Sequence, residues 1–288
     1  MISYRHHVVS LVAVFLALSV GVVLGGGPLS ELGRDDTPAS AHTRAQQQDS
    51  QAAARFGDDF ATAAAGTLYA DRLQNHAVSI VTMPGADGDD VSALAAQIET
   101  AGGSVAGTYE ATPALVDASE KSLVDTLGSQ LMTHLDDGVV PADASTYDRI
   151  GQLLGLSLSG DTIPLDKVSS IRQSLAGADL VTSPEQASRT AVVLVVLGKD
   201  ADDAILSGML SGLAATTTGV VVAGDTVSGI KGDLHGLRAQ PVADEVATVD
   251  SADTAVGQVT TVLALARSLK IQGGSFGASG SDGAVPLG

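Results

Sequence analysis

Side chains that could bind a soft metal ion are few in this sequence and lie far apart. The chain has no cysteine, which excludes thiolate metal sites, cysteine nucleophiles and disulfides. Copper sites are usually built from closely spaced cysteine, methionine or histidine residues, and the one close pair is His6 and His7. The other candidates are isolated in the sequence: His42, His76, His134, His235, Met83, Met132 and Met209. We expect each isolated histidine to be a surface or hydrogen-bonded residue. The metal ligands stay unknown, and a site assembled by the fold stays open.

Glycine-containing loops that could bind a phosphate group have the wrong neighbours. No G-x-G-x-x-G occurs, and Gly198-Lys199 is followed by Asp200 and lacks the upstream glycine of a P-loop. The loop at residues 84–90 contains three aspartates, where a phosphate would need amide donors and a base. We interpret Asp89 and Asp90 as residues at the positive, N-terminal end of a helix. The sequence therefore predicts no nucleotide site and no bound cofactor.

One stretch matches a hydrolase motif by letter. Residues 273–277, Gly-Gly-Ser-Phe-Gly, fit the G-x-S-x-G pattern of a nucleophile elbow, which requires a strand before the serine and a helix after it. Here we expect a helix before Ser275 and a flexible tail after it. We therefore predict no catalytic residues and a protein that is not an enzyme. A small-molecule-binding or degenerate enzyme domain is the weaker alternative, because only an α/β fold would suggest it.

The charge balance excludes nucleic acid as a partner. The chain carries 33 acidic and 15 basic residues, and its net charge is −18. A surface this acidic repels phosphate backbones and anionic lipid headgroups. It attracts cations only diffusely, because a specific metal site needs converging ligands.

The chain begins with an apolar segment that is long enough to cross a membrane. No residue from Val8 to Ser30 is charged, and a helix of about 17 to 20 residues is the minimum that spans a hydrocarbon core. We predict an uncleaved transmembrane anchor over residues 8–27, with residues 1–7 in the cytoplasm and the remainder of the chain outside it. A cleaved signal peptide is the alternative, although the apolar run is long and the cleavage site is imperfect.

Small side chains recur every four residues along this anchor, at Ala13, Ala17, Gly21 and Gly25. They share one face of the helix, and the last two form a G-x-x-x-G. Such a row lets two helix backbones approach closely in lipid, where packing drives association. The pattern favours self-association, and a chance row in a chain rich in alanine and glycine is an equal alternative.

Residues 28–76 are predicted to be a linker followed by a helical spacer. A helix start is expected at Thr37, with Pro38 in the first helical position. From residue 41 to 74 the apolar seam is thin and consists of four positions: Phe56, Phe60, Ala64 and Leu68. A weak coiled coil that continues the contact made by the anchor is one interpretation, and a solvated spacer helix is the other.

The remainder of the chain alternates between short apolar runs and helical patterns. Strands are expected at 77–83, 104–110, 191–197, 219–223 and 245–249, helices at 89–101, 202–215 and 252–270, and a mainly helical block at 117–178. This alternation predicts a Rossmann-like α/β domain with a mostly parallel sheet over residues 77–272. The tail at 273–288 is rich in glycine and serine and is predicted to be disordered.

Four stretches in the same order resemble the mycobacterial copper transport protein B (MctB) family. They are residues 1–25, from Met-Ile-Ser-Tyr-Arg-His-His to Leu-Gly, and residues 81–86, 191–198 and 249–266. The resemblance implies a pore-forming protein of the actinobacterial cell envelope that contributes to copper efflux across the outer membrane, with copper as the transported ion. It supplies no metal-binding or catalytic motif to transfer. The spacer departs from the family, whose members usually have a clearer coiled coil there.

A channel and an anchored module require different properties of the N-terminal helix. A pore lined by several copies of the N-terminal helix needs a polar face, and that helix has almost none. The alternative function is therefore a non-enzymatic module, anchored in the membrane, that binds other envelope proteins and affects copper only indirectly. Its expected partners are the membrane, a second copy of the chain and envelope proteins.

Overall fold

A computed structural model describes residues 38–159, 163–184, 188–190, 192–199 and 201–287. The expected anchor at 8–27 and its row of small residues, Ala13, Ala17, Gly21 and Gly25, lie outside the described residues. In the part of the chain that is described, no helix combines the length and the apolar character needed to cross a membrane. The chain divides into two compact units, residues 1–56 and residues 57–288.

The long helix α2, Pro38–Leu68, starts at the expected proline and ends earlier than predicted. The spacer helix was expected to continue to residue 74, but Asp71 and Asn75 adopt left-handed backbone conformations with φ of 57° and 64°. Such residues end a helix, because a right-handed helix cannot accommodate a positive φ. In the second unit, Ala61 and Ala65 of α2 are buried in the core.

The second unit is built on a seven-stranded sheet with the order β3-β2-β1-β4-β5-β6-β7. The strands are β1 Ala77–Thr82, β2 Ser104–Ala111, β3 Val181–Thr182, β4 Val192–Val196, β5 Gly219–Ala223, β6 Ala247–Val249 and β7 Ser275–Phe276. Every pairing is parallel except that of β3 with β2. The prediction of an α/β fold with a mostly parallel sheet is confirmed. Strands β1 to β3 are added toward one edge of the sheet and β4 to β7 toward the other. The boundary between β1 and β4 is therefore a switch point like that of a Rossmann fold.

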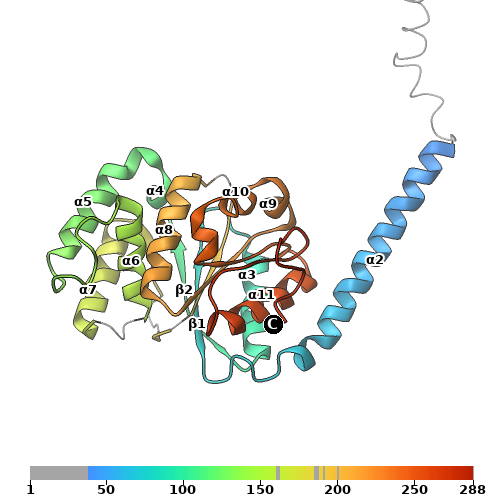
Figure 1. The fold of residues 1–288 in the computed structure, drawn as a ribbon, viewed down its shortest axis with the longest axis horizontal. Coiled ribbons are helices and arrows are strands. Elements are labelled where there is room, and N and C mark those ends of the chain that lie inside the picture. The colour runs from blue at the N-terminus through green and yellow to red at the C-terminus, as the bar shows by residue number, and fades with distance from the viewer. Residues whose placement is uncertain (1–37, 160–162, 185–187, 191, 200, 288) are drawn as a thin grey trace, which may run out of the picture. The chain divides into compact units, whose positions relative to one another are not determined.

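Helices cover both faces of this sheet (Figure 1). Their bounds are α3 Gly88–Thr100, α4 Pro113–Val116, α5 Lys121–Met132, α6 Thr146–Ser159, α7 Leu165–Gly177, α8 Asp203–Thr216, α9 Thr226–Lys231, α10 Asp233–Leu237 and α11 Ala255–Ser268. One apolar core lies between the sheet and the layer that contains α5 to α8, and a second lies between the other face and helices α3 and α11. All five residues of β4 and of β5 are buried, because each strand is central and covered on both faces.

The C-terminal tail is ordered, which contradicts the prediction of disorder for residues 273–288. Ser275 and Phe276 form β7 beside β6, and Phe276 is buried in the core. The α/β domain therefore extends beyond its predicted limit at residue 272. The composition predicted disorder, but the amides of Ala278 and Ser279 bind a buried aspartate, Asp250, directly after β6.

Candidate functional site

A cavity of about 220 Å³ lies at the carboxyl ends of the parallel strands, where the chain direction reverses. Ligands of open α/β sheets usually bind at this position. Four acidic side chains and one lysine line it. Asp87, Asp225 and Asp253 come from the loops after β1, β5 and β6, Asp90 comes from the first turn of α3, and Lys199 comes from the loop after β4. We call this space the switch-point cavity.

Close backbone contacts and helix caps fix the walls of the switch-point cavity. A Cβ atom on Gly198 would lie 1.8 Å from the carbonyl oxygen of Pro84, so only glycine allows the loops after β1 and β4 to touch. The Asp87 carboxylate accepts a hydrogen bond from the Asp89 amide (2.8 Å) and caps α3. Asp89 and Asp90 lie in the first turn of α3, as expected, but the capping residue is Asp87.

The other two aspartates also accept hydrogen bonds from backbone amides. Asp225 accepts from the Ser228 amide at 2.6 Å, and Asp253 accepts from the amide and hydroxyl of Thr226 at 2.8 and 2.9 Å. These bonds hold the carboxylates in place around the cavity. Each carboxylate therefore has a structural role that does not require a ligand.

The pKa of one carboxyl of the cavity, Asp90, is raised from its ordinary value. Burial raises the pKa of Asp90, and the negative charges of Asp87, Asp253, Asp225 and Asp89 raise it further. A site with this charge repels phosphate. Among the described residues, no three His, Cys, Asp or Glu side chains are grouped so that they could hold a metal ion.

We predict that Asp90→Asn stabilises the domain at pH 7. The folded pKa of Asp90 lies above the unfolded value of about 3.9, so ionised Asp90 costs stability at neutral pH, and that cost disappears as the pH falls. The melting temperature is expected to rise by about 1 to 2 °C at pH 7 and not at about pH 3. Asp89→Asn on the same helical turn is the control. An equal rise for both variants would show that the effect comes from the helix and not from the cavity.

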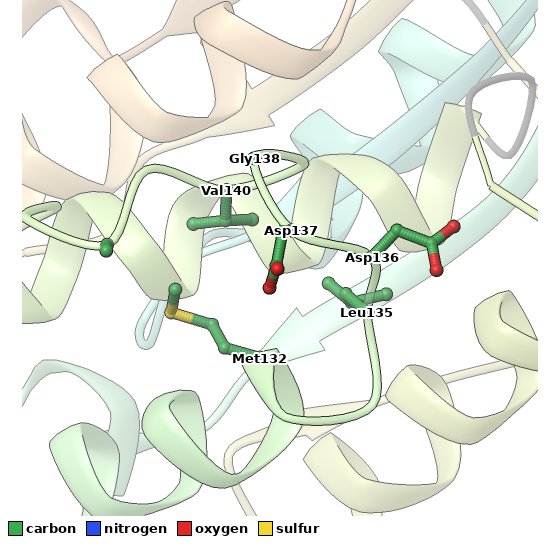
Figure 2. Close-up of a pocket in the computed structure, with 7 residues that line it drawn as sticks. Met132, Leu135, Asp136, Asp137, Gly138 and Val140 are labelled. Carbon is green, nitrogen blue, oxygen red and sulfur yellow. The ribbon is translucent and has the colours of Figure 1, made fainter.

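A second cavity, of about 270 Å³, lies at the loop between α5 and α6. Figure 2 shows the Asp137 carboxylate pointing into the space between Met132 and Val140, whereas the Asp136 carboxylate points away. A thioether is a soft ligand and a carboxylate is a hard one, so the two prefer different metal ions. One of each does not make a set of ligands for a single metal ion. We assign no metal to this cavity.

The histidines and methionines singled out from the sequence are dispersed in the fold. His76, His134 and His235 are exposed and belong to three separate segments, as expected for surface residues. Met83 and Met209 are buried in the apolar core, and Met132 lines the second cavity. His6, His7 and His42 lie outside the residues whose side chains are described.

The hydrolase-like motif does not form a nucleophile elbow. Ser275 lies in β7, and the chain continues into a turn at Gly277, where φ is 108°, not into a helix. The Ser275 hydroxyl is buried and has no hydrogen-bond partner among the described residues, so no base activates it there.

A buried ion pair at the end of β6 is the polar feature that the sequence did not reveal. Arg238 Nη1 lies 3.0 Å from Asp250 Oδ2, and the Asp250 residue is 1% exposed. Arg238 also donates to the Thr248 hydroxyl at 3.1 Å and to the Phe276 carbonyl at 2.7 Å. An aspartate directly after an apolar strand was the available signal, but its partner is 12 residues away, in the turn directly after α10.

Comparison with known proteins gives one family over nearly the whole chain. The family model described as "Copper transport outer membrane protein, MctB" matches residues 1–287. The chain is 29% identical over 297 aligned positions to the copper transporter MctB of Mycobacterium tuberculosis, and 28% identical over 299 positions to that of Mycobacterium leprae. Each alignment covers 92% of this chain and 92% of the relative.

Proposed function

Because this chain belongs to the MctB family of copper transport outer membrane proteins, we propose that it takes part in copper transport across the cell envelope. The observation that carries the proposal is a match that extends from residue 1 to residue 287 and so includes the N-terminal segment, the spacer and the α/β domain. We propose that copper is the transported ion and not a resident cofactor. The exposed histidines of the described residues lie in separate segments, which supports this view.

The N-terminal segment, in this proposal, is a single-pass anchor that places the α/β domain outside the cytoplasm. The absence of charge from Val8 to Ser30 supports it. Two copies would pack through the row of small residues, Ala13, Ala17, Gly21 and Gly25, and α2 would continue the contact as a weak coiled coil.

A second candidate is an anchored interaction module whose effect on copper is indirect. It is favoured by the α/β domain itself, in which the switch-point cavity is acidic and two of its aspartates, Asp87 and Asp225, already cap helices. Neither candidate assigns a catalytic role to any residue. The two differ in whether the purified protein conducts ions.

A deletion strain complemented with variants of the anchor tests the proposal. Cells that lack the protein are expected to accumulate several-fold more copper, measured by mass spectrometry of washed cells, and the wild-type chain should restore the normal level. Gly21→Ile combined with Gly25→Ile should restore it poorly, because the larger side chains separate the two helices. Val22→Ile combined with Val23→Ile is the matched control on the other faces of the helix.

Unchanged copper in the deletion strain would refute the transport role. Planar-bilayer recording of the purified full chain then separates the two candidates: copper-dependent conductance identifies a channel, and restored export without conductance identifies the interaction module.

A further inference from the structure

The C-terminal residues 273–287 fold back along the edge of the sheet, where their backbone pairs with β6. The Thr248 amide donates to the Gly274 carbonyl at 2.8 Å, and the Asp250 amide donates to the Phe276 carbonyl at 3.3 Å. Phe276 is the one large apolar side chain of this segment that is buried in the core. We call residues 273–287 the C-terminal strap.

The polar contacts of the strap converge on Asp250. Its Oδ1 accepts from the Ala278 amide at 2.6 Å, and its Oδ2 accepts from the Ser279 amide at 2.9 Å and also from the Ser279 hydroxyl. Arg238 holds the same carboxylate and donates to the Phe276 carbonyl. One buried ion pair therefore fixes both the strand and the turn that follows it.

The start of the strap has the properties of a hinge. Gly273 and Gly274 have φ of 70° and 108°, which only glycine adopts readily. A Cβ atom on Gly273 would lie 2.5 Å from the Asp244 carbonyl oxygen, and one on Gly274 would lie 2.7 Å from the Phe276 ring. Arg267 of α11 donates to the Gly273 carbonyl at 2.6 Å, which fixes the start of the strap to α11.

The closed strap covers the outer edge of β7 at Ser275. The Ser275 amide donates to the Asp282 carboxylate at 2.8 Å, and the Asp282 amide donates to the Ser275 carbonyl at 2.9 Å. The outer edge of the strand is thus covered by its own continuation, a common way to prevent pairing with another chain. If the strap left, the edge of β6 would become unpaired at Thr248 and Asp250.

The strap also forms one wall of the 400 Å³ cavity beside α10. Ser275, Ser279 and Asp282 come from the strap, and His235, Arg238 and Asp244 come from the opposite wall. Movement of the strap would therefore open this cavity and free the β6 edge in the same step.

We propose that the C-terminal strap opens as one unit about Gly273 and Gly274, with the Arg238–Asp250 pair as its latch, while the rest of the domain stays folded. In the closed state the edge of β6 is paired with the strap, and in the open state it is unpaired at Thr248 and Asp250. The strap is thus a conformational switch that covers or exposes the edge of β6. It is independent of the copper function proposed above.

Hydrogen exchange of the wild-type full chain, followed by mass spectrometry, tests the strap directly. The amides of Ser275, Ala278 and Ser279 are expected to exchange together, at least tenfold faster than those of β4, because they need only a local opening. Asp250→Asn should speed their exchange about tenfold to hundredfold, since it weakens hydrogen bonds to a charged acceptor. Ser279→Ala should have a smaller effect in the same direction.

Asp253→Asn is the matched control, since Asp253 is three residues from Asp250 and bonds to Thr226 instead of the strap. It should leave exchange of the strap unchanged. If the strap amides exchanged only as slowly as β4 in the wild type, no separate opening exists and the proposal is wrong. Loss of protection that starts at residue 287 and advances gradually, unaffected by Asp250→Asn and Ser279→Ala, would equally overturn it.

Discussion

Replacing Gly212 with alanine is expected to lower the free energy of unfolding of the α/β domain by about 3 kcal/mol or more. A Cβ atom at this position of α8 would lie 2.1 Å from the carbonyl oxygen of Asp148 and 2.6 Å from the amide nitrogen of Gln152. Both are backbone atoms of α6, so no side-chain rotation relieves the overlap. The two helices must separate, and the packing between them is lost along their length.

Urea unfolding of the domain, followed by circular dichroism, measures this loss. Gly177→Ala is the matched control, because Gly177 lies in helix α7 and a Cβ atom there would meet nothing within 4 Å. That variant should be as stable as the wild type or more stable by up to about 1 kcal/mol, since alanine favours a helix over glycine. Equal stability of the Gly212 and Gly177 variants would show that α6 and α8 can move apart freely.

The same contact explains why the position of α6 could not be predicted from the sequence. The segment was recognised as helical, but most of its residues are buried, including Gln152 and Ser157. A helix that is buried on most sides shows no clear polar face. Its sequence pattern therefore does not indicate which face of the sheet the helix covers. Helix α6 also contacts its neighbour α8 at Gly151, where an added Cβ atom would lie 2.1 Å from the Met209 carbonyl oxygen.

Strands were easier to predict than their order. The apolar β-branched runs at β4 and β5 identified both central strands almost to the residue, because burial on both faces leaves a continuous signal. The two-residue strands β3 and β7 carry no such signal, and tertiary contacts alone create them. Their existence depends on what lies beside them.

Only some of the acidic residues of the switch-point cavity could be recognised from the sequence. The aspartates of the loop after β1 were noticed, but Asp225 and Asp253 follow β5 and β6, more than a hundred residues later. Strand order brings these loops together, and no local pattern reports strand order. Burial is the main cause of the raised pKa of Asp90, and the charges of Asp253 and Asp225, which this assembly brings near, add to it.

Acid is expected to destabilise the domain through Asp250. Burial raises the pKa of this carboxyl, but hydrogen bonds from Ser279, Arg238 and Ala278 outweigh burial and hold the pKa below its usual value. A lowered folded pKa stabilises the folded state above the unfolded pKa of about 3.9, and this contribution is lost as the pH falls through the folded value. The free energy of unfolding should therefore fall below about pH 4, and Asp250→Asn should remove this part of the pH dependence.

The loss of unfolding free energy caused by Asp250→Asn at pH 7 can be compared with the free energy of opening the strap. Removing one partner of a buried ion pair usually costs about 3 to 5 kcal/mol, because the other charge is left without compensation. Arg238 escapes part of that cost if the strap opens and water reaches the guanidinium, which is 11% exposed in the closed state. The loss measured by urea unfolding should then not exceed the free energy of strap opening obtained from hydrogen exchange of the wild type. A larger loss would mean that Asp250 stabilises elements beyond the strap, and Asp253→Asn, which leaves the latch intact, sets the baseline for the comparison.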